Sequence, residues 1–273
     1  MLAKGNIWGL ITVRHAIPKT RWARERKFET AEEIFAYLEK KVLPTFKDAP
    51  NLLGWYVCDE CPVSEVPARE NLYRFLKKAD PDHPTWSVLD RTWDLREFTQ
   101  TYDVLGIDPY PVGKGRGKIR RITDMCRVAR GATLGARPMW NVPQTFNWNR
   151  KPGDRYPSYE ELRSIFWQHI ACGATGLIGY KFESAFAPEY SEYVKEKKRD
   201  ELMRTDAPNW LNVCRVAAEV ATMTNVILSV EAAPKVTVDH EAVACRAWVC
   251  HGDLYVLVTN PLREPLAFGV TVA

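Results

Sequence analysis

The sequence lacks several features that would assign it to a class at once. No run of about 18 consecutive apolar residues occurs in its 273 residues, so no membrane-spanning helix is expected. Residues Met1 to Gly9 contain no apolar core of a signal peptide. The cellular location is left open, and a secreted or periplasmic protein is expected only if the natural N-terminus lies upstream.

Metal and cofactor signatures are also missing. The five histidines form no H-x-H or H-E-x-x-H cluster, so a metal-dependent hydrolase is the weakest reading of the sequence. Cys58 and Cys61 have C-x-x-C spacing, but Cys245 and Cys250 are wrongly spaced to complete a zinc site. No glycine-rich turn follows the first strand-like run, which argues against a dinucleotide fold. The sequence therefore implies neither a metal nor a cofactor.

Neither charge nor cysteine content indicates a special class. The formal net charge is +4, and the densest basic run, at residues 195–199, is interleaved with acids, so nucleic-acid binding is not expected. Seven cysteines do not suggest a complete disulfide framework. Cys58, Cys126, Cys172 and Cys214 lie in apolar segments, where a free thiol packs as a small hydrophobe. A hydrophobic content of 46% predicts a globular protein with a substantial core.

Strand-like and helix-like segments alternate along most of the chain. Apolar, β-branched runs predict strands over Ile7–Val13, Leu53–Cys58, Trp86–Leu89, Tyr102–Ile107, Pro138–Val142 and Ala174–Tyr180. Amphipathic segments predict helices over Thr30–Phe46, Pro67–Ala79, Lys118–Ala129, Ser158–Ile170 and Pro208–Leu228. Thr30 with Glu33, and Ser158 with Glu161, form capping boxes at two helix starts. This order predicts a parallel sheet, and six successive units favour a (β/α)8 TIM barrel over an open sheet.

The pattern changes after Pro234. Short strands separated by turns are predicted over 235–239, 243–249, 254–259 and 268–272, which indicates a small antiparallel β module. We therefore expect a barrel domain over 1–232 and a module over 233–273. A closed barrel needs eight strands and a sandwich more than four, so we expect both parts to be incomplete.

The most informative segment is Leu52–Glu60, where an apolar strand ends in two adjacent carboxylates, Asp59 and Glu60. Barrels of this class present catalytic groups at the carboxyl ends of their strands. Strict alternation would place Tyr56 with Glu60 on one face and Trp55 with Asp59 on the other, but alternation relaxes at the end of a strand, so both acids can still reach the rim. Repulsion between the acids and the nearby aromatic rings should raise the pKa of Glu60. A protonated carboxylic acid is the proton donor that glycoside cleavage needs.

Four segments, in order along the chain, carry a resemblance to a known family. They are Lys47–Tyr56 followed by Asp59-Glu60, then Tyr102–Pro111, Trp140–Phe146 and Gly173–Tyr180. The chain resembles the TIM-barrel glycoside hydrolases related to clan A and their uncharacterised bacterial relatives, and the segments look like strands four, six, seven and eight. The resemblance covers roughly residues 30–180, with a trailing β module. It implies a glycosidase that cleaves O-glycosidic bonds of an oligo- or polysaccharide.

The resemblance implies that Glu60 is the acid/base residue that ends strand four. The family usually has Asn before this residue, and this chain has Asp59. The family's nucleophile is a Glu at the end of strand seven, where this chain offers only Gln144. This departure puts a two-step retaining mechanism in question, because a carboxamide cannot form the covalent glycosyl intermediate.

The identity of the second catalytic group stays open in the sequence. Asp108, after the sixth strand of the family pattern, could act as nucleophile or activate water, and Glu183 and Asp90 are weaker candidates. The Asp-Glu pair is also similar to that of β-hexosaminidases, in which the 2-acetamido group of the substrate attacks. In that case Asp59 would orient the amide, and Glu60 would protonate the leaving oxygen.

Residues near the strand ends predict the substrate contacts. Aromatic platforms for pyranose rings are expected at Tyr110, Trp140, Trp148 and Tyr180. Gln144 is expected to bond sugar hydroxyls, and His15 to line the site. The expected partner is a carbohydrate, with no nucleic acid and no membrane, and the oligomeric state is not predicted. A competing hypothesis is a non-catalytic carbohydrate-binding protein on a degenerate barrel.

Overall fold

The computed structural model describes residues 7–113, 115–148, 154–181 and 208–273. Contacts divide the chain into two compact units, Met1–Ile107 with Gly131–Met139, and Asp108–Arg130 with Trp140–Ala273. The division does not fall at residue 233, so the expected boundary between a barrel domain and a β module stays a prediction.

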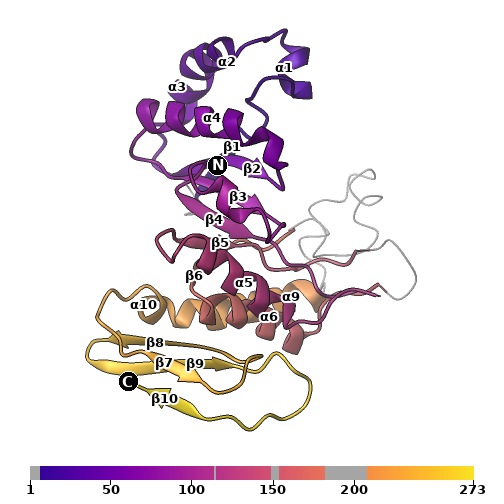
Figure 1. Ribbon diagram of the computed structural model, residues 1–273, viewed down its shortest axis with the longest axis vertical. Helices are drawn as coiled ribbons and strands as arrows, with labels where there is room; N and C mark the ends of the chain where they lie inside the picture. The colour runs from indigo at the N-terminus through magenta and orange to yellow at the C-terminus, as the bar shows by residue number, and fades with distance from the viewer. Residues whose placement is uncertain (1–6, 114, 149–153, 182–207) are drawn as a thin grey trace. The chain divides into compact units, whose positions relative to one another are not determined.

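The described residues form six parallel strands that follow one another in chain order (Figure 1). They are β1 (Gly9–Thr12), β2 (Leu52–Asp59), β3 (Thr85–Leu89), β4 (Val104–Ile107), β5 (Met139–Asn141) and β6 (Ala174–Leu177). Strands that are neighbours in the sheet are also neighbours in sequence, which is the βα arrangement that the alternation predicts. The α/β class and the parallel sheet are confirmed. The number of strands is two short of a closed (β/α)8 barrel.

The first unit packs its helices on β2. The helical segments are α1 (Arg21–Glu25), α2 (Ala31–Tyr37), η2 (Leu38–Val42), α3 (Leu43–Phe46), η3 (Val63–Glu65), α4 (Val66–Ala79) and η4 (Leu95–Phe98). Ile34 and Leu38 from the first predicted helix, and Leu72 from α4, share one buried cluster with Trp55 and Val57 of β2. Burial of these apolar side chains is the main force that holds the helices on the sheet.

The helix predicted over residues 30–46 is present but changes its pitch. Its capping box is confirmed, since Thr30 accepts from the Glu33 N–H and the Glu33 side chain accepts from the Thr30 N–H. A π-helical turn, η2, separates α2 from α3, and the Leu43 N–H donates to Leu38 O. Pro44 has no N–H and its ring crowds the carbonyl four residues earlier, so the ladder cannot continue as a regular α-helix.

Gly54 lies where β2 approaches the residue before β3. A Cβ atom there would lie 2.4 Å from the carbonyl oxygen of Pro84, which also accepts from the Trp55 N–H at 2.9 Å. Gly54→Ala is therefore expected to force the strands apart and to lower the free energy of unfolding by about 1–3 kcal/mol in urea denaturation. Gly131→Ala, where an added Cβ meets no atom within 4 Å, is the control and should not destabilise. Equal stability of the Gly54 variant and wild type would contradict the close approach.

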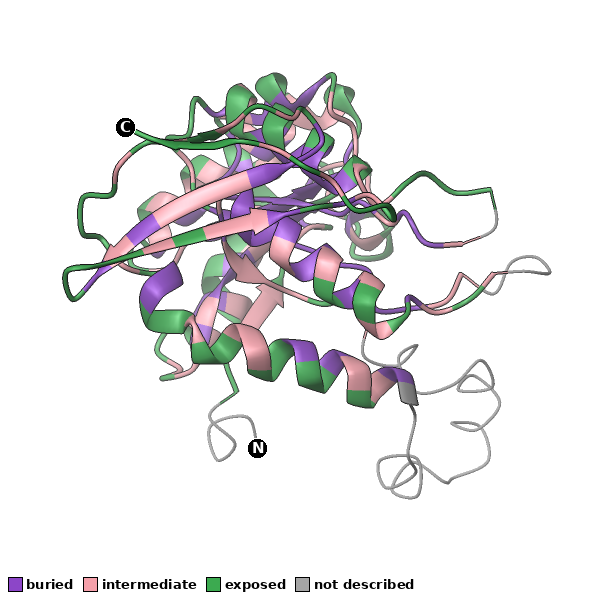
Figure 2. Ribbon diagram, turned by 90° about the horizontal axis from the view of Figure 1, so that it is seen from below, coloured by how far each residue is buried: buried purple, intermediate pink, exposed green. Residues whose placement is uncertain are grey.

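The second unit contains the remaining helices and the β module. Its helices are α5 (Arg121–Ala132), α6 (Tyr159–Ala171), α9 (Pro208–Thr222) and α10 (Thr224–Ile227), and its further strands are β7 (Val236–Val238), β8 (Ala244–Cys250), β9 (Asp253–Thr259) and β10 (Val270–Val272). β8 pairs antiparallel with β9, and β7 with β10, so the antiparallel module is confirmed. The capping box of Ser158 with Glu161 opens α6 as predicted. Helices carry buried and exposed residues on opposite sides (Figure 2). Of the helices in the described part of the chain, none is long and apolar enough to cross a membrane.

Candidate active site

Asp59 and Glu60 lie at the carboxyl end of β2. Because β1, β2 and β3 are parallel, the residues that follow them gather at one edge of the sheet, and Arg14 and Asp90 occupy the equivalent positions after β1 and β3. The Glu60 N–H donates to Val88 O at 2.9 Å, which fixes the backbone where the strand ends. Glu60 has φ 49°, in the left-handed region, and its side chain is exposed. Left-handed residues other than glycine cost free energy and cluster at functional positions.

A β-bulge changes which face the acids occupy. The register with β3 shifts between Tyr56 and Cys58, so alternation does not continue regularly to the strand end. Strict alternation, which would place Asp59 and Tyr56 on opposite faces, therefore does not hold at the end of the strand, and the Asp59 carboxylate lies beside the Tyr56 hydroxyl. Burial, and then this carboxylate, raise the pKa of Tyr56 strongly.

Trp55 does not contribute to the surroundings of Glu60. Its side chain is fully buried in the helix-facing core, and its Nε1 donates to Asp80 Oδ2 at 2.8 Å. Only Tyr56 remains of the two rings that were expected to affect Glu60.

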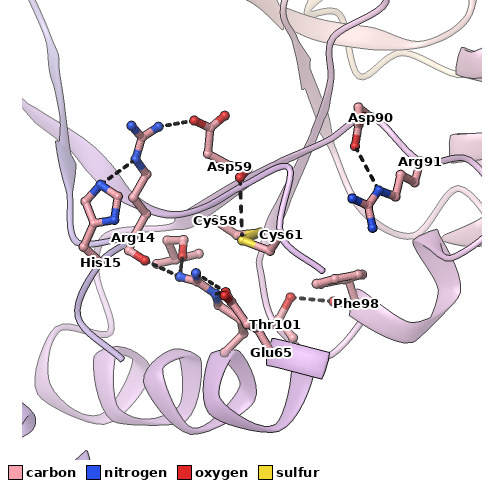
Figure 3. Close-up of a disulfide and its surroundings, with 12 residues drawn as sticks. Arg14, His15, Cys58, Asp59, Cys61, Glu65, Asp90, Arg91, Phe98 and Thr101 are labelled. Atoms are coloured by element: carbon pink, nitrogen blue, oxygen red, sulfur yellow. Dashed lines mark hydrogen bonds and ion pairs between the residues drawn. A yellow bond between two sulfur atoms is a disulfide. The ribbon is translucent and has the colours of Figure 1, made fainter. Parts of the chain in front are cut away.

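Arg14 forms an ion pair with Asp59 (Figure 3). Its guanidinium carbon also lies 5.5 Å from the centre of the Tyr56 ring, a cation–π contact. Both members of the ion pair are about one-third exposed. The positive charge of Arg14 offsets the negative charge of Asp59, so the repulsion between Asp59 and Glu60 is smaller than between two isolated carboxylates. Arg14 was not among the predicted site residues, although Arg14 follows the end of a strand just as Glu60 does.

His15 lies beside Arg14, as its place after β1 predicts. Arg14 Nε donates to His15 Nε2 at 3.2 Å, so this nitrogen acts as an acceptor. Burial, and then the charges of Arg14 and Arg69, lower the pKa of His15. His15 is therefore neutral at pH 7 and joins Arg14 and Asp59 in one group at the ends of β1 and β2.

Arg69 of α4 holds the backbone of this group in place through hydrogen bonds. It is buried, and burial lowers its pKa. Its guanidinium donates to Val57 O at 2.6 Å, to Glu65 Oε2 at 2.5 Å and to Arg14 O. These bonds tie the carboxyl ends of β1 and β2 to one helix and fix the backbone that carries Arg14 and Asp59.

Arg69→Met is expected to lower the free energy of unfolding by about 2–3 kcal/mol, because two buried carbonyl oxygens lose their donor. Glu65 is one-third exposed and regains water, which limits the loss. Arg74→Met is the matched control, since Arg74 pairs with Glu70 at the same helical spacing and is largely exposed. Its effect should stay within about 0.5 kcal/mol. Equal urea midpoints for the two variants would show that Arg69 has no anchoring role.

A disulfide joins Cys58 to Cys61 across the two acids (Figure 3). The expectation that Cys58 packs as a free thiol is wrong, because the turn after the bulge brings the two Cα atoms to 6.0 Å. Cys126 and Cys172 are free and buried as expected, whereas Cys214 is free but exposed, so the expectation that it packs as a small hydrophobe is wrong. The bridge encloses Asp59 and Glu60, and its effect is a local restraint on their backbone.

Asp108 directly follows β4 and belongs to the second unit. Asp108 is buried, whereas Asp90 is only half-buried. Asp90 lies 3.9 Å from Arg91, a loose ion pair. Glu183 lies outside the described residues.

Four aromatic rings of the second unit form a cluster after β4, β5 and β6. Three are predicted substrate residues, and the fourth, Phe146, has no such prediction: Tyr110, Phe146, Trp148 and Tyr180. The centres of Tyr110 and Tyr180 are 5.8 Å apart and the rings are stacked. The guanidinium carbon of Arg116 lies 3.7 Å from the centre of the Trp148 ring. Tyr180 is 45% exposed, so the cluster offers one open aromatic face.

Gln144 holds a loop together. It is fully buried, its Oε1 accepts from the Val112 N–H, and its Nε2 donates to Val112 O, both at 2.9 Å. Nε2 also donates to Phe146 O at 3.2 Å. Both polar atoms of the amide are thus engaged with the backbone, which favours a structural role over contact with a sugar.

Trp140 of β5 rests on β6. A Cβ on Gly176 would lie 2.6 Å from the Cδ1 atom of Trp140, so glycine is needed for the indole to lie across the neighbouring strand. The neighbouring Asn141 turns to the helix side, where its Nδ2 lies 3.0 Å from His169 Nδ1. Trp140 therefore lies on the face away from the helices.

Comparison with known proteins gives the fold. No family model and no curated sequence matches the chain. Solved β-galactosidases are similar in structure, and the one from Rahnella sp. R3 has a TM-score of 0.57 and 11% identity over 82% of this chain and 47% of its own. The enzyme from the psychrophilic Marinomonas ef1 has a TM-score of 0.54 and 11% identity over 68% and 46%. The enzyme from Bacillus circulans sp. alkalophilus has a TM-score of 0.50 and 14% identity over 77% and 41%.

This chain spans about half the length of those structures or less. At such low identity the likeness concerns the fold alone. It agrees with the glycoside-hydrolase-like architecture that the strand-end motifs predict.

Proposed function

We propose that the protein is a glycoside hydrolase in which Glu60 is the general acid. The observation that carries the proposal is the placement of Glu60, an exposed carboxyl group at the carboxyl end of a buried parallel strand. The backbone of Glu60 is in the left-handed region, where glycine would be more stable than glutamate. The presence of a glutamate there supports a functional role. The fold shared with β-galactosidases supports the same class of reaction.

In this mechanism Glu60 donates its proton to the glycosidic oxygen as the bond to the anomeric carbon breaks. Arg14 neutralises Asp59 and so lowers the repulsion between Asp59 and the neighbouring Glu60. His15, which accepts from Arg14, holds the guanidinium in place. Asp59 and Arg14 are thus positioning residues for Glu60.

Asp108 is our choice for the second catalytic carboxylate, as a nucleophile or as the base for water. It directly follows a parallel strand, as Glu60 does, and it is more buried than Asp90. Substrate assistance by a 2-acetamido group is the alternative. It requires Asp59 to orient the amide, and the ion pair with Arg14 already engages that carboxylate.

The aromatic cluster of Tyr110, Phe146, Trp148 and Tyr180 is our proposed platform for the substrate. Sugar rings present apolar C–H faces that pack on aromatic rings. The open ring of Tyr180 and the stacked Tyr110 provide such a surface, and Trp140 extends the set.

The test is release of nitrophenol from a panel of nitrophenyl glycosides that includes β-galactoside, β-glucuronide, α-fucoside and N-acetyl-β-glucosaminide. Turnover of at least one of them is expected. Absence of turnover across the panel and across natural oligosaccharides would overturn the proposal. Binding of those sugars in calorimetry without turnover would favour a non-catalytic carbohydrate-binding protein instead.

A further inference from the structure

A long groove lies within the second unit, between helices α6, α9 and α10 and the β8–β9 hairpin. Its volume is about 1180 Å3, which exceeds the range of roughly 300–1,000 Å3 typical of pockets for one small molecule. All its lining residues belong to that unit, and none is part of the candidate active site. The groove therefore has room for a ligand of more than one ring.

The floor of the groove is aromatic and apolar. Trp167 of α6, Trp248 of β8 and Tyr255 of β9 line it, together with Met223 and Leu257. Trp167 and Tyr255 are only partly buried, so their rings offer surface to a ligand. Flat aromatic side chains in an open groove suit a ligand with planar apolar faces.

A rigid polar group lies beside this floor. Arg163 Nε lies 2.9 Å from both carboxylate oxygens of Glu219, and Trp167 Nε1 donates to Glu219 Oε1 at 2.9 Å. Among the described residues, Glu219 Oε2 accepts only from Arg163, so it keeps capacity for a further hydroxyl donor. The carboxylate is thus held in one orientation before any ligand binds.

Both arginines that line the groove have an acidic partner, and a third acid, Glu160, also lines it. Arg163 pairs with Glu219 at 2.7 Å, and Arg263 lies 3.5 Å from Glu161. A groove whose cations each have an acidic partner does not select a strongly anionic or cationic ligand. It suits a neutral ligand that combines hydroxyl groups with apolar faces.

Trp248 supplies an independent observation. It is 5% exposed, it lines the groove, and its indole N–H has no hydrogen-bond partner among the described residues. A buried donor without a partner costs free energy, and a ligand acceptor recovers it only when the indole nitrogen, which is itself buried, turns toward the groove.

We propose that this groove is a second carbohydrate-binding site, which takes a neutral glycan of more than one sugar unit. The rings of Trp167 and Tyr255 stack on the sugar faces, and Glu219 and the Trp248 N–H bond to sugar oxygens. The site goes beyond the proposed hydrolysis, because it binds a glycan without any residue of the reaction. It would keep a polymeric ligand on the protein.

The experiment measures binding of the full chain to soluble galactan, xylan, mannan and laminarin by affinity electrophoresis, with polygalacturonate as an anionic comparison. We expect one or more neutral glycans to bind and polygalacturonate not to bind. Tyr255→Ala and Glu219→Gln should weaken the binding roughly tenfold each, while hydrolysis of a small nitrophenyl glycoside is unchanged. Trp248→Phe should weaken the binding without loss of thermal stability. Trp93→Ala, at an 81% exposed position of the other unit, should bind like wild type.

Failure of all four neutral glycans to bind the wild-type chain would overturn the proposal. Binding by the three groove variants that equals wild type, with their folding verified by thermal denaturation, would overturn it as well. The result is separate from the proposed hydrolysis, because Glu60→Gln should keep glycan binding. A chain that binds through the groove but cleaves nothing would refute the hydrolase proposal and leave the groove proposal intact.

Discussion

Glu60→Gln is expected to lower kcat/KM for a nitrophenyl glycoside or oligosaccharide substrate by roughly 10²–10⁴-fold, the range for a positioned general acid. Glutamine has the same shape but cannot deliver a proton to the leaving oxygen. The loss should be smaller for a dinitrophenyl glycoside, whose leaving group needs little protonation.

The left-handed backbone at position 60 provides a sharper control. Glu60→Gly should lose as much activity as Glu60→Gln, because both remove the proton donor. It should nevertheless be no less stable than wild type, and up to about 1 kcal/mol more stable, since glycine adopts this conformation freely. Enzyme kinetics and urea denaturation of both variants test whether activity is lost while stability is kept. Normal turnover in either variant would refute the assignment of Glu60.

Asp108→Asn is expected to lower kcat by a similar factor, roughly 10²–10⁴-fold, since the amide neither attacks the anomeric carbon nor accepts a proton from water. NMR detection of the first product anomer identifies the role. Retention indicates a nucleophile with the carboxyl groups about 5 Å apart, and inversion indicates a base with a separation of roughly 6.5–9.5 Å. In Asp108→Gly, added azide should restore turnover and give a glycosyl azide.

Asp90→Asn is the control for Asp108, because Asp90 also follows a strand but is only half-buried and is loosely paired with Arg91. Its kcat should stay within about threefold of wild type, since surface ion pairs contribute little. An unchanged kcat in Asp108→Asn would remove Asp108 from the mechanism. If that variant also cleaves only substrates with a 2-acetamido group, Asp59 becomes the partner of Glu60.

The sequence predicts those features that depend on local pattern. The capping boxes at Thr30 and Ser158 and the order of the six strands were readable because a few neighbouring residues determine them. The π-helical turn before Pro44 was also readable in principle, because proline removes an N–H from the helix.

Features that depend on contacts between distant segments were not predictable. The bulge at Tyr56 and Cys58 arises from the register with β3, and it moved Asp59 to the side of Tyr56. Nothing near Gln144 in sequence indicates that its amide bonds to Val112, which lies 32 residues away. Arg14 was within reach of the strand-end rule, but its pairing with Asp59 spans 45 residues.

The Cys58–Cys61 bridge affects how the protein must be handled. Because its ring contains only four residues, the bridge restricts the unfolded chain less than one that closes a long loop, and its loss should cost no more than about 2 kcal/mol of stability. Its loss would instead free the peptide units on either side of Glu60 to rotate. In dithiothreitol the protein should therefore stay folded while the backbone around Glu60 becomes free to rotate, so the proposed activity is expected to fall in reducing buffers and to return on reoxidation.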